Sequence, residues 1–202
     1  MDKNQKIESV EQIKSLIEKA TGIYLVDYSG VNVEDINQLR RGFLNEDVTY
    51  KDLPTEGWLE VFSELSACQV MNVSLLGGEP LLRDDLFPLI DGIVANRMRF
   101  DLLSNGSLLT ATVAERLAAT GRCDQVQISL DGSTAGVHES LRGQGTFEPA
   151  LAAIKNLQAV GLPVTVRVTV HPANINDLAA IAELLLDELG LPGFSTNAAS
   201  AL

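Results

Sequence analysis

Cysteine is scarce in this sequence: Cys68 and Cys123 are the two cysteines in 202 residues. Two cysteines far apart in the chain are too few for a disulfide framework or for a cluster held by thiolates, so we expect both to be small buried hydrophobic residues. No apolar run approaches the roughly 18 residues that cross a membrane. The N-terminus has no apolar signal segment, and we therefore expect a cytoplasmic protein with no membrane contact.

Basic and aromatic residues are also few. The chain has 15 Lys and Arg against 27 Asp and Glu, a formal net charge of −12. Such a charge repels phosphate backbones unless the basic residues cluster, so a nucleic-acid partner is not expected. Aromatic residues make up 5% and hydrophobic residues 46% of the chain, a profile typical of an α/β protein rather than a disordered one. The length suits a single α/β domain over residues 1–202.

Apolar periodicity and glycine breaks divide the chain into alternating strands and helices. Strands are predicted at about 23–28, 73–76, 100–104, 125–130, 164–170 and from 193 onward, and helices at about 7–20, 32–43, 55–65, 86–94, 110–121, 146–161 and 178–190. The segment holding His138 and Arg142 is predicted to be a loop. This alternation indicates about six mostly parallel strands, in a partial (β/α)6 barrel or an open parallel sheet.

Particular side chains are expected to begin helices or to fill the core. Thr55, Thr110 and Thr146 are predicted N-caps, and Trp58 is a predicted core residue. His138 and the remaining histidine, His171, are expected to form loop hydrogen bonds. No set of Ser, His and Asp or of Cys and His is evident, so we nominate no catalytic residue and no metal ligand.

Polar residues gather where the predicted strands end. They are Gly77-Gly78-Glu79, Ser104-Asn105-Gly106, Ser129-Leu130-Asp131-Gly132, His171 and Ser195-Thr196-Asn197. The carboxyl ends of parallel strands share one edge, where α/β proteins bind ligands. Two adjacent glycines leave the backbone open to a ligand, and a glutamate beside them can accept hydrogen bonds from an ammonium group. The pattern predicts a cleft for a small molecule.

The first quarter of the chain carries a resemblance of its own. It rests on residues 19–34, KATGIYLVDYSGVNVE, and on Gln38-Leu39-Arg40-Arg41. This segment, over about residues 1–51, resembles the N-terminal region of the bacterial ribosomal stalk-base protein. The resemblance implies binding to ribosomal RNA, although this chain has fewer Lys and Arg than that family carries.

A second resemblance covers about residues 53–202. The matching stretches are 77–86 (GGEPLLRDDL), 104–106 (SNG), 128–132 (ISLDG) and 138–143 (HESLRG), and the pattern continues through Gly145-Thr146-Phe147-Glu148, Asn174 and Phe194-Ser195-Thr196-Asn197. They are similar to the radical S-adenosylmethionine (SAM) enzymes, particularly the branch that carries a SPASM extension and modifies peptides.

This resemblance implies a partial barrel that holds SAM across its strand ends. Glu79, with the backbone of Gly77 and Gly78, would receive the methionyl amino group. Arg142 would bind the methionyl carboxylate. Ser104, Asn105, Ser129 and Asp131 would lie near the ribose and sulfonium, and Ser195 to Asn197 near the adenine. The alternative is that Ser104, Asn105 and Asp131 are turn or helix caps and that Arg142 is a surface charge.

The sequence departs from that family where its cluster should be. The family has a Cys-x3-Cys-x2-Cys motif that holds a 4Fe–4S cluster, and an iron–sulfur cluster needs thiolate ligands. That motif is absent, the stalk-base-like segment stands in its place, and the SPASM extension is not expected either. We expect a hybrid with a retained SAM site, no 4Fe–4S cluster and no reductive cleavage. The alternatives are a chimeric or designed fold without a ligand and a ribosome-associated module.

Overall fold

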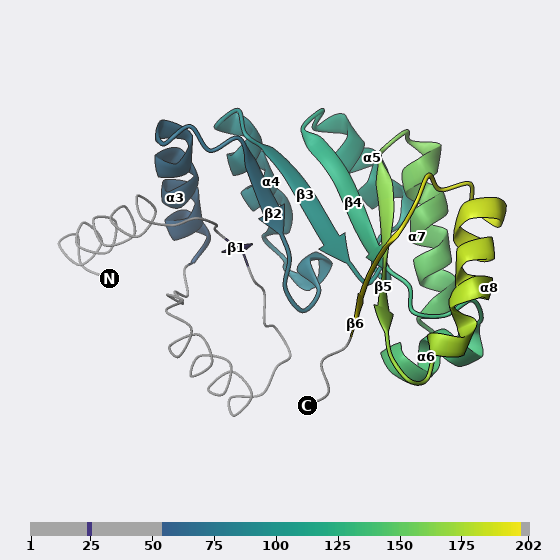
Figure 1. Cartoon of the computed structure of the whole chain (residues 1–202). Helices are drawn as coiled ribbons and strands as arrows, with labels where there is room; N and C mark the ends of the chain where they lie inside the picture. Colours follow the sequence, from purple (N-terminus) through teal and green to yellow (C-terminus); the bar gives the residue numbers. More distant parts are fainter. Residues whose placement is uncertain (1–23, 26–53, 199–202) are drawn as a thin grey trace, which may run out of the picture. The chain divides into compact units, whose positions relative to one another are not determined.

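The computed structural model describes residues 24–25 and 54–198 (Figure 1). The chain divides into two compact units, Met1–Phe100 and Asp101–Leu202. The helices predicted at 7–20 and 32–43 lie outside the described residues. The strand predicted at 23–28 is described at β1 (Tyr24–Leu25).

The first unit pairs β1 with β2 (Asn72–Leu75) in parallel, with Tyr24 opposite Ser74 and Leu25 opposite Leu75. A strand from the stalk-base-like segment therefore lies beside the first strand of the radical-SAM-like segment, as the hybrid interpretation expects. Helices α3 (Thr55–Ala67) and α4 (Leu86–Ala95) pack against each other. Their buried faces are Val61, Phe62 and Leu65 on α3 and Leu86, Leu89, Ile90 and Ile93 on α4.

The beginning of α3 differs from the prediction. Pro54, rather than Thr55, is the N-cap, and it makes no side-chain cap. The Thr55 hydroxyl instead donates to the carboxylate of Asp85, which precedes α4. Burial by itself raises the pKa of Asp85, but the hydrogen bonds from Arg83 and Thr55 outweigh it and hold that pKa below its usual value.

Two predictions about buried residues of the first unit need correction. Trp58 is half-buried rather than a core residue, and its ring stacks on Phe62 with centroids 6.4 Å apart. Cys68 is exposed, whereas Cys123 is buried as predicted. Cys68 is the C-cap of α3, and the next residue, Gln69, has a φ of 62° that turns the chain out of the helix.

The second unit holds three neighbouring parallel strands, β4 (Cys123–Ser129), β5 (Val164–Val170) and β6 (Ser195–Ala198). In the register, Val126 lies opposite Val164 and Arg167 lies opposite Ser195. β3 (Arg99–Ser104) leads from the first unit into the second. The strands predicted from the apolar pattern are therefore present in the described residues, and every pairing given for them is parallel.

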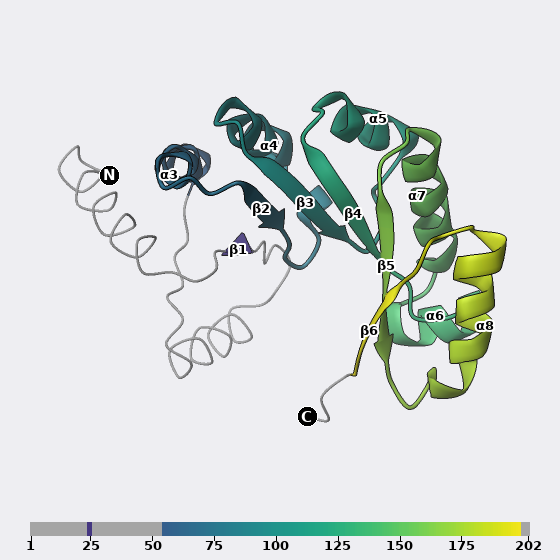
Figure 2. The same cartoon turned by 45° about the horizontal axis from the view of Figure 1, so that its top comes forward.

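Helices cover this sheet of the second unit. They are α5 (Ala111–Ala119), α6 (Ala135–Arg142), α7 (Phe147–Ala159) and α8 (Leu178–Ala182), which continues as a π-helical segment over Glu183–Glu188. α7 packs on β4 and β5, with α5 and α6 beside it (Figures 1 and 2). The core is aliphatic: Ile154 and Leu157 of α7 are fully buried, as are Ile128 and Val166 of the strands. Sequence periodicity predicted the helices α5, α7 and α8 of this layer.

α6 replaces the loop predicted around His138 and Arg142. The Thr134 hydroxyl accepts from the N–H of Val137 and caps its first turn. The helix has eight residues and one buried side chain, His138, so it carries no apolar stripe for sequence analysis to detect. Thr110 caps α5 as predicted, but Thr146 makes no side-chain cap at α7.

No helix in the described part of the chain is long and apolar enough to cross a membrane.

Candidate functional site

The strand end of the first unit is a short turn built around Glu79. Gly77 and Gly78 are exposed, and neither has a positive φ. The Glu79 side chain is buried and accepts from the N–H of Leu81 at 3.2 Å, which starts the 3-10 turn Pro80–Leu82. A carboxylate adjoining two open glycine backbones can accept hydrogen bonds from a ligand ammonium group.

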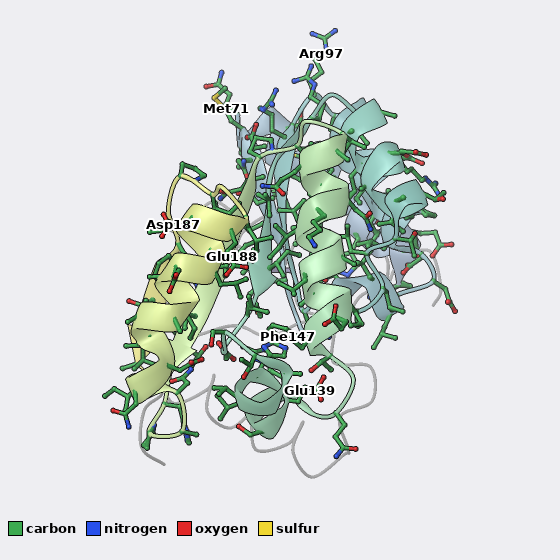
Figure 3. The ribbon with its side chains drawn as sticks, turned by 90° about the vertical axis from the view of Figure 1, so that its right-hand side faces the viewer. Met71, Arg97, Glu139, Phe147, Asp187 and Glu188 are labelled. Carbon is green, nitrogen blue, oxygen red and sulfur yellow. The ribbon has the colours of Figure 1, made fainter. Side chains whose placement is uncertain are left out.

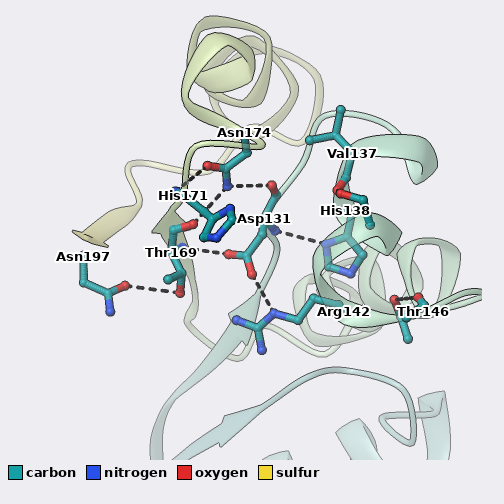
Figure 4. Close-up of polar contacts among 11 residues, drawn as sticks. Asp131, Val137, His138, Arg142, Thr146, Thr169, His171, Asn174 and Asn197 are labelled. Carbon is teal, nitrogen blue, oxygen red and sulfur yellow. Dashed lines mark hydrogen bonds and ion pairs between the residues drawn. The ribbon is translucent and has the colours of Figure 1, made fainter. Parts of the chain in front are cut away.

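The strand end of the second unit is organised around Asp131, whose side chain is 2% exposed. One carboxylate oxygen accepts from the N–H of Thr169 at 2.7 Å, and the other accepts from Nε of Arg142 at 2.6 Å (Figure 4). The backbone N–H of Asp131 donates to Nδ1 of His138 at 3.0 Å, and its carbonyl accepts from Nδ2 of Asn174 at 2.9 Å. Both carboxylate oxygens and both backbone groups of Asp131 are therefore engaged inside the unit.

Asn174 ties the ends of β4 and β5 together. Its side-chain nitrogen donates to the carbonyls of Asp131 and Thr169, both at 2.9 Å, and its oxygen accepts from the N–H of His171 at 2.7 Å. The residue is fully buried. Sequence analysis placed Asn174 in a motif without giving it a role. The signal in the sequence is an asparagine in the turn after the strand predicted at 164–170, where asparagine side chains commonly bond nearby backbone groups.

His138 supports this cluster from α6. Its ring is buried and packs against Phe147 with centroids 5.8 Å apart. Burial lowers the pKa of His138, and the nearby Arg142 lowers it further, against the opposing charges of Asp131 and Glu139. A neutral imidazole fits its contact, because Nδ1 must be unprotonated to accept from a backbone N–H.

The turn between α6 and α7 is held by a second contact of the same helix. Glu139 and Phe147 lie close together at the N-terminal end of α7 (Figure 3). The Glu139 carboxylate accepts from the N–H of Phe147 at 3.4 Å. Together with the ring contact of His138, this bond keeps α6, and therefore Arg142, in a defined place against α7.

Gly132 permits this close packing of α6. A Cβ on Gly132 would lie 2.3 Å from the backbone nitrogen of His138 and 2.8 Å from Cβ of Val137. No side chain fits there without a shift of the helix. The glycine after Asp131 therefore fixes how near α6, and so Arg142, comes to the strand end.

The guanidinium group of Arg142 is bonded through Nε, and its two terminal nitrogens are open. Its Nε is paired with Asp131, and its side chain is 33% exposed. Within the described residues its two terminal nitrogens have no hydrogen-bond partner. It is thus more than the isolated surface charge considered from the sequence: it presents two donor nitrogens beside a strand end.

The other predicted site residues lie as follows. The Ser104 and Asn105 side chains each accept from a backbone N–H two residues ahead, at 2.9 and 2.8 Å, which is the turn-capping role considered as the alternative. Ser129 ends β4 and is half-buried. The Ser195 hydroxyl donates to the carbonyl of Val166, and Asn197 accepts from the Thr169 hydroxyl, both at 3.4 Å. Through Thr169, the structure joins Asp131, Arg142 and Asn197 in one cluster.

Among the described residues, no group of three or more His, Cys, Asp or Glu side chains is placed to hold a metal ion.

Comparison with known proteins places this arrangement in a family. Residues 32–185 match the family model described as the radical SAM superfamily. The chain belongs to the radical SAM superfamily. Residues 1–52 match a different family, ribosomal protein L10. Two different families thus match one chain, over ranges that overlap at residues 32–52, which is consistent with the hybrid that the sequence predicted.

This radical SAM chain has similar curated relatives. Mycofactocin maturase MftC of Mycobacterium tuberculosis (strain ATCC 25618 / H37Rv) is 40% identical over 134 residues, which are 66% of this chain and 34% of that protein. PqqA peptide cyclase of Ruegeria pomeroyi is 33% identical over 141 residues, 69% of this chain and 37% of that protein. The chain spans about a third of the length of these relatives.

Solved structures show the same fold. Streptococcus suis SuiB bound to S-adenosylmethionine matches with a TM-score of 0.65 and 15% identity, covering 98% of this chain and 52% of that one. anSMEcpe with bound AdoMet and the Cp18Cys peptide matches with a TM-score of 0.61 and 17% identity, covering 73% and 44%. The fold is a half-barrel of parallel strands alternating with helices, and the predicted fold class is confirmed.

Proposed function

We propose that this chain binds SAM at its strand ends and does not cleave it reductively. Membership of the radical SAM superfamily and the SAM-bound structures of the same fold support binding. The observation that carries the proposal is the open end of Arg142 beside the end of β4, because two guanidinium nitrogens there match a carboxylate. The same geometry suits the methionyl group of SAM, whose carboxylate would bind Arg142.

The remaining contacts follow the motifs of the family. Glu79, with the backbone of Gly77 and Gly78, would receive the methionyl ammonium group. The ribose and sulfonium would lie near Ser104, Asn105, Ser129 and Asp131, and the adenine near Ser195 and Asn197. In this proposal the chain's own groups bind and orient SAM, and none of them transfers an electron.

The cysteines do not fit a 4Fe–4S cluster. The cluster of this family is held by three thiolates of one motif, and the sequence contains two cysteines in all. Cys68 is exposed at the end of α3, and Cys123 is buried at the start of β4. Without the cluster, SAM bound to this chain has no electron source for cleavage.

Calorimetric titration of SAM tests this proposal. We expect saturable binding by the wild-type protein and binding at least about tenfold weaker for Arg142→Gln and for Glu79→Gln, since each variant loses a charge-assisted hydrogen bond. Arg116→Gln on α5 is the control, because it removes a positive charge from the second unit outside the strand-end cluster. No heat at millimolar SAM would refute binding and leave a fold without a ligand.

The match of residues 1–52 to ribosomal protein L10 supports a second candidate, association with ribosomal RNA. The net charge of −12 opposes it. If this candidate is correct, affinity for ribosomal RNA falls steeply with salt and falls further when Arg40 and Arg41 are both replaced by Gln. Absence of binding at low salt removes it.

A further inference from the structure

We propose that Asp131 is a positioning residue that holds Arg142 by Nε, so that the ligand carboxylate binds end-on to the two terminal nitrogens of Arg142. This inference rests on the proposed SAM site and assigns Asp131 a different part in it. The family resemblance places Asp131 next to the ligand. The contacts of this structure place it behind Arg142.

The Asp131 carboxylate is bonded through both oxygens and enclosed by the protein. Its two oxygens accept from Thr169 and from Arg142, at 2.7 and 2.6 Å, and the side chain is 2% exposed. Each of these oxygens could accept a second hydrogen bond, but a side chain that is 2% exposed offers almost no surface to a ligand hydroxyl. The N–H bond of Thr169 also links β4 to β5, so displacing it would open the strand end.

One edge of the Arg142 guanidinium group remains open to a ligand. A guanidinium group has five N–H donors on three nitrogens, and a carboxylate can pair with two adjacent nitrogens at once. Because Nε is taken by Asp131, the edge that includes Nε is closed to a ligand. The edge formed by the two terminal nitrogens remains, so the carboxylate must approach along the axis of the side chain.

Holding Arg142 in advance affects how it binds a ligand. A long arginine side chain has much rotamer freedom to lose when it binds a ligand. The bond to a buried carboxylate removes part of that freedom before the ligand arrives, and such preorganisation strengthens binding. It also neutralises the arginine charge, so the pair attracts a carboxylate by geometry more than by net charge.

Preorganisation and charge neutralisation predict opposite effects of removing the Asp131 charge on the affinity for a carboxylate. If Arg142 acts as a simple positive charge, Asp131→Asn frees that charge and strengthens binding of a carboxylate. If Asp131 positions Arg142, the same variant weakens it. Asparagine keeps an oxygen that can accept from the N–H of Thr169, so the tie between β4 and β5 is preserved in this variant.

The experiment compares SAM with decarboxylated SAM, which lacks the carboxylate, by calorimetry. We expect Asp131→Asn to reduce the preference for SAM over decarboxylated SAM at least about fivefold, and Arg142→Gln to abolish it. The double variant should match Arg142→Gln alone, because Asp131 acts through Arg142. A preference that Asp131→Asn leaves unchanged or increases, or additive effects in the double variant, overturns the proposal.

Asp177→Asn is the matched control. Asp177 also accepts two hydrogen bonds in the second unit, from the N–H and hydroxyl of Ser133, both at 2.7 Å, but no arginine is among these partners. This variant removes the same charge and should leave the preference between the two ligands unchanged. A reduction equal to that of Asp131→Asn overturns the proposal in favour of a general charge effect.

A readout without SAM separates this inference from the proposed function. In nitrogen-15 spectra, Nε–H of Arg142 should exchange slowly with water, and its signal should be absent from Arg142→Lys and exchange fast in Asp131→Asn. Fast exchange in the wild-type protein overturns the positioning role, whether or not SAM binds. Slow exchange in a protein that binds no SAM keeps the positioning of Arg142 and refutes the proposed function instead.

Discussion

The ends of β2 and β4 carry the same kind of residue in very different settings. After β2, the Glu79 side chain accepts from Leu81, two residues further along the chain. After β4, the groups of Asp131 bind partners 11, 38 and 43 residues away. This bond of the first turn joins two residues of one segment. The second exists only when β4, β5 and α6 are assembled, so changes there should alter the stability of the whole unit.

The largest expected effect comes from Asn174→Ala. This variant deletes three hydrogen bonds, one to the buried carbonyl of Asp131 and two to the part-buried carbonyl of Thr169 and N–H of His171, so we expect unfolding to require at least about 3 kcal/mol less free energy in urea. Asn156→Ala, which loses one bond to the carbonyl of Leu109, should lose about 1 kcal/mol. Equal losses for the two variants would contradict the bridging role of Asn174.

Two glycine-to-alanine substitutions that lie close together in the chain test the packing of α6. Gly132→Ala should destabilise the protein by about 1–3 kcal/mol, because its Cβ would overlap the backbone of His138. Gly136→Ala places a Cβ in open space within α6 and should be neutral or stabilise by up to about 1 kcal/mol. Thermal unfolding of both variants distinguishes them, and the same sign for both would show that α6 is not packed closely on Gly132.

His138 gives the cluster a dependence on pH. Its pKa is lowered in the folded state, chiefly by burial, so the unfolded chain binds its proton more readily. The stability that this group contributes is fully present above its ordinary pKa of 6.5 and is lost as the pH falls through the lowered folded value. The free energy of unfolding should therefore fall between pH 7.5 and 5.5, and less steeply in His138→Gln. Parallel curves for the two proteins would contradict this.

The smallest effect is expected in the local turn. In Glu79→Gln the side-chain amide oxygen can still accept from the N–H of Leu81, so the free energy of unfolding should change by less than about 1 kcal/mol. Urea unfolding measures it beside Asn174→Ala. A loss as large as that of Asn174→Ala would remove the distinction between the two strand ends.

The same distinction explains what the sequence could predict. The strands and most helices follow from apolar periodicity, because residues such as Val166 and Ile154 are buried by the pattern of their own segment. The bond of Glu79 to Leu81 and the turn bonds of Ser104 and Asn105 join residues two positions apart, so local reasoning reaches these bonds. α6 was not predicted as a helix because it buries a histidine rather than an apolar stripe.

The engagement of Asp131 could not be predicted from spacing. Its carboxylate depends on Thr169, which the register of β4 and β5 brings near, and on Arg142, which depends on α6 being a helix. The family motifs include Asp131 and Arg142 but not Thr169. They could not tell a residue that touches the ligand from one that holds its neighbour, since that difference lies in tertiary hydrogen bonds.

The enclosure of Asn174 also affects how the protein ages chemically. Asparagine deamidates when the backbone nitrogen of the next residue attacks the side-chain carbonyl. Here that nitrogen, of Ile175, is bonded to the carbonyl of His171, and the amide itself is fixed by its three bonds. The reaction requires this strand end to open first. Slow conversion of Asn174 to aspartate during storage, followed by mass spectrometry, would thus record how often the second unit opens.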